Sequence, residues 1–265
     1  WNQNRVIWIQ NPSTKEHFIY KRWIENTYKY IEIEGHQVIV SNHPKVEAIH
    51  TTYHLAEKLG YLSNSILDKI NDIKTNNPKK YRHKYLGGWL EKAEGVVFNN
   101  WKFGKFNPDG LQISYGQDYG FSIDPTTLVG VAIDKKKKII YVKEHLYKPK
   151  LTTTQIAYIN LDVCKTSLIV GDSAEPRLID ELYRMGCNIV AAEKGQGSIS
   201  LGVALLQDYQ IILEENSTNI AKEFNNYIYA DKGSKLFVDN YNHAIDAIRY
   251  IVTYILGRSS GIEIR

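Results

Sequence analysis

The chain has 265 residues, which is enough for one large domain or for one domain and part of a second. A hydrophobic fraction of 43% allows a sizeable core, and a formal net charge of +4 permits nucleic-acid binding without establishing it. There is no signal peptide and no apolar run long enough to cross a bilayer, so we expect neither a secreted nor a membrane-spanning protein. Because the chain begins with Trp1 rather than Met, we expect a fragment. Cys164 and Cys187 lie in apolar stretches without a CxxC pattern, which predicts buried free thiols.

The first hundred residues predict an incomplete α/β segment. A buried strand is expected over residues 5–10, and an amphipathic helix over 65–75 is expected to end at Asn77-Pro78. A second helix and a second strand are expected over 18–26 and 37–42. The tetrapeptide at 107–110, Asn-Pro-Asp-Gly, has strong turn chemistry. It predicts a domain boundary that divides the chain into 1–107, 108–257 and a tail at 258–265.

The second part of the chain has a more regular pattern. Three sequential antiparallel strands are expected over 111–119, 128–133 and 139–147, and the lysine run at 135–138 lies at a hairpin tip, where it is either a solvated turn or a DNA-backbone contact. Helices and strands then alternate, with helices over 153–165, 176–185, 200–207, 220–229 and 243–256, and strands over 168–171, 188–192 and 211–213. This layout predicts an RNase H-like α/β domain with a central mixed sheet flanked by helices.

Three aspartates lie where such a fold places functional sites. Asp118 comes at the end of the first strand, Asp172 directly follows an apolar strand, and Asp246 lies in the first turns of a largely apolar helix. Each also has a simpler interpretation. Asp172 could cap the next helix together with Ser173, and Asp246 could be a solvated residue favoured by the helix dipole.

Carboxylates from separate elements suit metal-assisted phosphodiester hydrolysis. Two Mg²⁺ or Mn²⁺ ions, about 3.5–4 Å apart, can activate a water and stabilise the leaving oxygen. Such ions prefer oxygen ligands. We therefore expect a metal site built from Asp118, Asp172 and Asp246. The nearby His243 could bind the metal, position a water, contact phosphate or cap its helix.

Four segments resemble, in order, the nuclease domain of the large terminase subunit of tailed bacteriophages. They are residues 115–126 (YGQDYGFSIDPT), 169–176 (IVGDSAEP), 192–199 (AEKGQGSI) and 242–250 (NHAIDAIRY), and the last is the most specific. The resemblance covers about residues 110 to 257. It implies an endonuclease that cuts concatemeric viral double-stranded DNA, with Asp118, Asp172 and Asp246 as metal ligands and His243 as an accessory catalytic residue.

The resemblance has further implications. Lys194 would belong to a loop near the DNA, although a plain glycine turn is an equal alternative. Asp124 is interpreted as a turn residue, and Asp180 and Glu223 as residues on solvated helix faces. The family implies a portal protein and a small terminase subunit as partners, a ring oligomer in the full motor, and the cytoplasm of an infected bacterium as the location.

The first hundred residues resemble the late part of the terminase ATPase domain, less specifically. The matching stretches are 8–12 (WIQNP), 17–20 (HFIY), 51–53 (TTY) and 81–89 (YRHKYLGGW). The phosphate-cradling GxxxxGK[ST] loop of that domain is absent from the sequence. We therefore expect no ATP hydrolysis by this chain.

Two alternatives to the packaging nuclease remain open at this point. An RNase H-like fold with three carboxylates could serve a resolvase, a transposase-type nuclease or an RNase. The chain could also be a non-catalytic DNA-binding or motor-docking module in which the acidic residues are structural.

Overall fold

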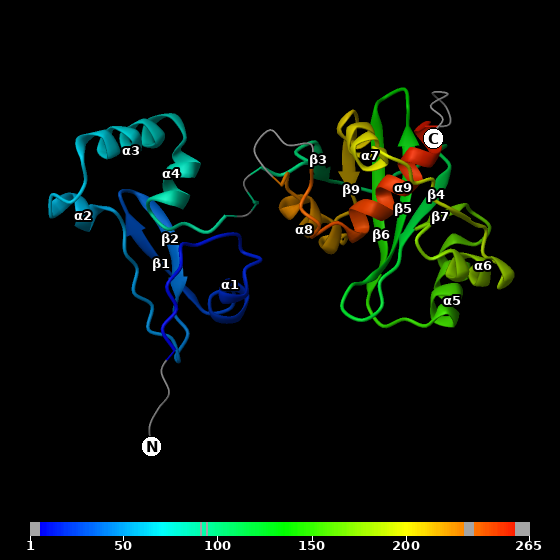
Figure 1. Cartoon of the computed structure of the whole chain (residues 1–265), viewed down its shortest axis with the longest axis horizontal. Coiled ribbons are helices and arrows are strands. Elements are labelled where there is room, and N and C mark those ends of the chain that lie inside the picture. Colours follow the sequence, from blue (N-terminus) through cyan, green and yellow to red (C-terminus); the bar gives the residue numbers. More distant parts are fainter. Residues whose placement is uncertain (1–5, 91, 94, 231–235, 258–265) are drawn as a thin grey trace, which may run out of the picture. The chain divides into compact units, whose positions relative to one another are not determined.

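Long-range contacts divide the chain between Ala93 and Glu94 (Figure 1). The structure is a computed structural model, and it describes residues 6–90, 92–93, 95–230 and 236–257. The predicted tail at 258–265 lies outside the described residues. The turn at 107–110 lies inside the second unit, because a strand before it, β3 (Trp101–Phe103), pairs with β9 (Gln210–Leu213) of that unit. The first unit is Trp1–Ala93 and the second unit is Glu94–Arg265.

The first unit is a small α/β assembly around one hairpin. Its strands pair antiparallel through a two-residue turn in which Glu34 and Gly35 both have positive φ, the backbone conformation that favours a tight hairpin. Apolar side chains of the second strand pack against the helices that follow, with Val38, Ile70 and Tyr81 fully or almost fully buried. Its elements are α1 (Phe18–Trp23), β1 (Tyr28–Ile33), β2 (His36–Ser41), α2 (His54–Lys58), α3 (Asn64–Asn76) and α4 (Pro78–Lys84).

The predicted buried strand over 5–10 is wrong for residues 6–10, and Arg5 lies outside the described residues. Val6, Ile7 and Ile9 are 87%, 84% and 92% exposed, and residues 6–10 form no strand. The apolar composition predicts burial, but burial needs a partner surface. A local pattern cannot show whether the chain supplies one.

The second unit is built on a seven-stranded mixed sheet with the order β3-β9-β6-β5-β4-β7-β8. The three central strands are antiparallel neighbours, β9 is parallel to β6, and β7 and β8 continue parallel to β4. This confirms the predicted mixed sheet and its three-stranded antiparallel core. The lysines at 135–138 form the hairpin tip between two of these strands. The strands are β4 (Ile113–Asp118), β5 (Thr126–Asp134), β6 (Ile139–Lys148), β7 (Ile169–Gly171) and β8 (Ile189–Ala191).

Helices cover both faces of this sheet, as Figure 1 shows. One apolar cluster joins α7, α8 and α9 to the sheet, and a second joins α5 and α6 to the opposite face. Successive side chains of β7 point to opposite faces of the sheet, so Val170 packs in the first cluster and Ile169 in the second. Cys164 and Cys187 are buried free thiols in the second cluster, as predicted. The helices are α5 (Thr153–Cys164), α6 (Pro176–Arg184), α7 (Ser198–Gln207), α8 (Thr218–Asn226) and α9 (His243–Gly257).

The long helix α9 lies unusually close to the central strand β4. A Cβ added to Gly116 would lie 1.8 Å from the carbonyl oxygen of Ala247, so only glycine fits at this point of the strand. The contact lies two residues before the end of β4. It therefore holds the first turns of α9 against the strand that ends in Asp118.

Candidate active site

Asp118 ends β4 and Asp172 follows β7, the neighbouring parallel strand, at the same edge of the sheet. The register pairs Gln117 of β4 with Gly171 of β7, so the next residue of each strand is one of the two aspartates. The backbone N–H of Asp172 donates to the carbonyl of Gln117 at 3.0 Å, which extends the pairing into the site. Parallel strands lie about 5 Å apart. The fold therefore places the backbones of these two aspartates at neighbouring strand ends, at the same edge of the sheet.

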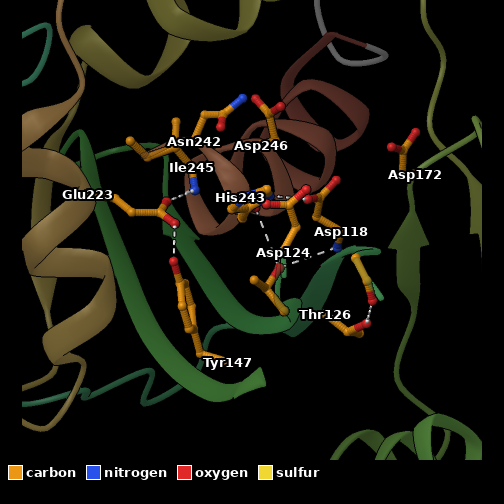
Figure 2. A network of polar contacts seen from close by, with 12 residues as sticks. Asp118, Asp124, Thr126, Tyr147, Asp172, Glu223, Asn242, His243, Ile245 and Asp246 are labelled. Carbon is orange, nitrogen blue, oxygen red and sulfur yellow. Dashed lines mark hydrogen bonds and ion pairs between the residues drawn. The ribbon is translucent and has the colours of Figure 1, made fainter. Parts of the chain in front are cut away.

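The first turn of α9 brings His243 and Asp246 to this edge (Figure 2). His243 Nδ1 lies 3.2 Å from Asp118 Oδ2, and its Nε2 lies 3.5 Å from Asp124 Oδ1. The carbonyl of His243 accepts from Thr127 Oγ1 at 3.4 Å, and Thr127 is the partner of Asp118 in β5. The imidazole is thus held between two carboxylates, and its backbone is tied to the sheet.

Asp118 carries the strongest electrostatic perturbation among the three aspartates. It is 7% exposed, and burial raises its pKa to about 6; the charges of Asp246 and Asp172 act in the same direction. The hydrogen bond from His243 opposes the rise. The same hydrogen bond raises the pKa of His243, because an adjacent carboxylate favours the imidazolium. Burial also raises the pKa of Asp246, against the influence of Arg249.

Cations of the protein itself hold the other two carboxylates. Lys194 forms an ion pair with Asp172, and its Nζ lies 5.1 Å from the ring centroid of Tyr250. Arg249 donates to Asp246 Oδ1 from Nε at 3.1 Å and from Nη2 at 3.0 Å. Among the described residues, no three acidic, histidine or cysteine side chains lie close enough together to enclose one ion. Figure 2 accordingly shows Asp172 apart from Asp118 and Asp246.

The donor chemistry of this edge fits a hard divalent cation. Burial and neighbouring carboxylates raise the pKa of Asp118 and of Asp246, and a raised carboxylate pKa marks a place where added positive charge is favourable. Oxygen donors are the ligands that Mg²⁺ and Mn²⁺ take. Asp118 and Asp172, on neighbouring strands, and Asp246 across from them are the residues that would hold such ions.

The structure rejects the simpler interpretations of Asp172 and Asp246. Asp172 Oδ1 accepts from Ala174 N at 2.8 Å, a local turn, whereas α6 starts at Pro176 with Glu175 as its N-cap residue. Asp172 is therefore not a helix cap. Asp246 is not a solvated residue, because its side chain is only 20% exposed and is bound to Arg249.

Two acidic residues outside the predicted set need a new interpretation. Glu223 was expected on a solvated helix face, but it is fully buried and accepts hydrogen bonds from Tyr147 and from the backbone of α9. Asp124 does lie in a loop, as expected, but it also faces His243. Neither contact could be predicted from local spacing, since each joins segments far apart in sequence. Asp180 is on the helix surface as predicted, paired with Arg184.

Sequence comparison places these features in one family. A family model described as "Terminase RNAseH like domain" matches residues 118–253, slightly more than half of the chain. The chain belongs to this terminase family. A second model, "Phage terminase large subunit", matches residues 2–88. Together they confirm the resemblance on which the sequence analysis relied, for both units.

Relatives of this chain include the terminase large subunit of Bacillus phage SPP1. It is 33% identical over 210 residues, which cover 72% of this chain and 48% of the relative. The PBSX phage terminase large subunit of Bacillus subtilis is 30% identical over 141 residues, covering 51% of this chain and 33% of the relative. The chain thus spans half or less of the length of these curated relatives.

Solved terminase structures share the fold. The nuclease domain of the large terminase from bacteriophage SPP1, described with bound Mn, is 32% identical with a TM-score of 0.52 and covers 58% of this chain and 96% of that one. The large terminase of a thermophilic bacteriophage has a TM-score of 0.51 at 19% identity, covering 93% of this chain and 62% of that one. The second similarity bears on the fold alone.

In the described residues, no helix is both long and apolar enough to cross a membrane.

Proposed function

We propose that the second unit is a divalent-metal-dependent endodeoxyribonuclease that cleaves concatemeric double-stranded DNA during viral genome packaging. The observation that carries this proposal is the placement of Asp118 and Asp172 at adjacent strand ends, with the charges of Asp172 and Asp246 close enough to raise the pKa of Asp118. The Mn described for the SPP1 nuclease domain supports it.

Asp118, Asp172 and Asp246 would hold the ions, and Mg²⁺ or Mn²⁺ in a two-metal arrangement suits their oxygen donors. Bound ions would supply Lewis-acid activation of a water and neutralisation of charge on the phosphate. Lys194 pairs with Oδ1 of Asp172 and would compete with an incoming ion for this carboxylate. Asp246 keeps a second oxygen, Oδ2, beside the one that Arg249 occupies. The protein's own cations, Lys194 and Arg249, thus pair with two of the proposed ligands.

His243 is proposed to transfer a proton in the reaction. Its Nδ1 is engaged by Asp118, which fixes the ring and favours the protonated form. Its Nε2 meets Asp124 at the longer distance of 3.5 Å, and Asp124 is mostly exposed. Nε2 is therefore the atom that would donate to a phosphate oxygen or to the leaving group.

DNA contact is proposed to be mainly to the phosphates. Lys194, once released from Asp172, would face a phosphate near the reacting group. A nuclease of this class has little need to read base edges, so binding should weaken steeply with salt. The portal protein and the small terminase subunit are proposed as partners, in a ring that forms in the complete motor.

Plasmid cleavage tests the function. Wild type and Asp118→Ala are compared with Mg²⁺, with Mn²⁺ and with EDTA, and Asp162→Ala, on an exposed stretch of α5, is the matched control. We expect metal-dependent cutting by wild type and by the control, and none by Asp118→Ala. Equal cutting by Asp118→Ala would refute the site. A preference for four-way junctions or RNA–DNA hybrids would point to a resolvase or RNase instead. ATPase activity in a clean preparation would contradict the expectation drawn from the missing phosphate loop.

A further inference from the structure

A buried carboxylate next to the proposed metal ligands is not one of them. Glu223, on α8, has no exposed surface. Its Oε1 accepts from the Tyr147 hydroxyl of β6 at 3.0 Å, and its Oε2 accepts from the Ile245 N–H of α9 at 2.9 Å. The backbone N–H of Ala244 acts on the same carboxylate. Figure 2 shows this side chain reaching the first turn of α9 from the side opposite Asp118.

The N-terminus of α9 needs such an acceptor. The first N–H groups of a helix have no partner within the helix, and here they are buried beneath α8. The Ile245 N–H finds its acceptor in Glu223 Oε2, whereas Asn242, the residue before the helix, donates from Nδ2 to Asp239 Oδ1 at 3.0 Å. The acceptor therefore comes from another element of the fold, and the negative charge of Glu223 also opposes the positive end of the helix dipole.

Burial of this carboxylate is costly. Desolvation raises the pKa of Glu223 to about 7, against the hydrogen bonds that favour its charged form. A buried ionisable group that serves only for packing could be replaced by an amide or an apolar side chain at lower cost. Keeping Glu223 in a buried place therefore suggests a role beyond packing, and its hydrogen bonds to the backbone of Ala244 and Ile245 place that role at the start of α9.

The two N–H groups that Glu223 engages belong to the residues between His243 and Asp246. On the other side of the same turn, Thr127 holds the carbonyl of His243 to the sheet at 3.4 Å. The first turn of α9 is thus held from two sides. We propose that Glu223, supported by Tyr147, is a positioning residue that sets the placement of His243 and Asp246 relative to Asp118 and so determines the affinity of the site for divalent metal.

This inference rests on the proposed function, and metal binding by the full chain tests it without relying on cleavage. Mn²⁺ affinity is measured by calorimetry for wild type, Glu223→Ala, Glu223→Gln and Tyr147→Phe, together with the thermal midpoint of each. Leu182→Ala, in the apolar cluster on the far face of the sheet, is the control for lost stability alone. Cleavage as a function of Mn²⁺ concentration is recorded in parallel.

We expect Glu223→Ala to weaken Mn²⁺ binding by about 10-fold, the effect typical of residues that orient metal ligands. The Mn²⁺ concentration for half-maximal cleavage should rise by the same factor, more than the maximal rate falls. Glu223→Gln keeps one oxygen acceptor and should recover most of the affinity. Tyr147→Phe should weaken binding about 2-fold, and Leu182→Ala should lower only the thermal midpoint.

Unchanged Mn²⁺ affinity in a folded Glu223→Ala would overturn the inference, and so would unchanged affinity in Tyr147→Phe if Glu223→Ala did not fold. So would a loss of affinity in Leu182→Ala equal to that in Glu223→Ala. If wild type binds Mn²⁺ and cuts DNA while the Glu223 variants match it, the positioning role alone is refuted. If wild type neither binds Mn²⁺ nor cuts DNA, the proposed function is refuted with it.

Discussion

Asp118→Asn should make the metal-free protein more stable. Burial and two neighbouring carboxylates raise the pKa of Asp118 from 3.8 to about 6 in the folded state. At 1.36 kcal/mol per pKa unit, the charged form therefore costs the fold about 3 kcal/mol. Because the folded pKa lies above the unfolded one, this cost is fully present above pH 6 and disappears as the pH falls toward 3.8. Asparagine removes the charge at every pH.

The gain at pH 8 in EDTA should be about 1–3 kcal/mol, since the amide and its neighbours will not recover the whole cost. For a unit of this size, this corresponds to a rise of about 2–12 °C in the thermal midpoint. Differential scanning calorimetry of the full chain measures it, in the transition of the second unit. Asp162→Asn, whose side chain is 84% exposed, is the control and should not change the midpoint.

Metal should reverse the order of stability. Mn²⁺ at about 100 times its Kd stabilises wild type by about 2.7 kcal/mol, and Asp118→Asn should gain much less. Wild type would then melt below the variant in EDTA and at or above it in Mn²⁺. A variant that is less stable in EDTA would show that the charge of Asp118 does not destabilise the fold. An equal gain from Mn²⁺ in both proteins would show that Asp118 is not a metal ligand.

Three further results are expected. Gly116→Ala should lower the free energy of unfolding by about 3 kcal/mol or more in urea denaturation, because its Cβ would overlap the carbonyl of Ala247. Burial lowers the pKa of His145 from 6.5 to about 4. The free energy of unfolding of wild type should therefore fall by up to about 3 kcal/mol as the pH falls from 6.5 to 4. His145→Gln should lose correspondingly less, which denaturation at pH 7.5 and pH 4.5 measures. Lys194→Gln should bind Mn²⁺ about 2- to 10-fold more tightly without DNA, in calorimetry, because no internal cation then competes for Asp172.

Each of these has a clear contrary result. Wild-type stability in Gly116→Ala would mean that α9 can move away from β4 at little cost. Identical acid sensitivity in wild type and His145→Gln would locate the sensitivity elsewhere. Weaker Mn²⁺ binding in Lys194→Gln would mean that the lysine holds the side chain of Asp172 in the conformation that binds metal, rather than competing with the metal for it.

Much of the site could be predicted from sequence because strand ends and helix starts are local features. An alternating pattern marked β4, with Asp118 at its end, and an apolar run followed by Asp172 marked β7, and the parallel register then places the two aspartates at neighbouring strand ends. The position of Asp246 one turn into an apolar helix marked it in the same way. The pairing of Arg249 with Asp246 follows local helix spacing. The pairing of Lys194 with Asp172 was not predictable, because the lysine reaches this aspartate through the fold and not through spacing.

The errors share a physical cause. Glu223 has the spacing of an exposed helical residue, and its burial depends on Tyr147 and α9, far away in sequence. Residues 6–10 have the composition of a buried strand, but within the described part of the chain they pair with no strand. Local patterns report what a segment can bury, whereas the surface it meets is set by long-range pairing.

The short strand β3 has a practical consequence for dissecting this protein. It pairs with the outer edge of β9, and it comes before the 107–110 turn that looks like a natural place to cut the chain. A fragment starting at that turn would leave the backbone N–H and carbonyl groups along β9 open to other molecules, a well-known cause of aggregation. A fragment starting near residue 95 keeps β3 paired with β9. If such a fragment cuts no DNA, the loss of activity cannot be attributed to aggregation through an exposed β9.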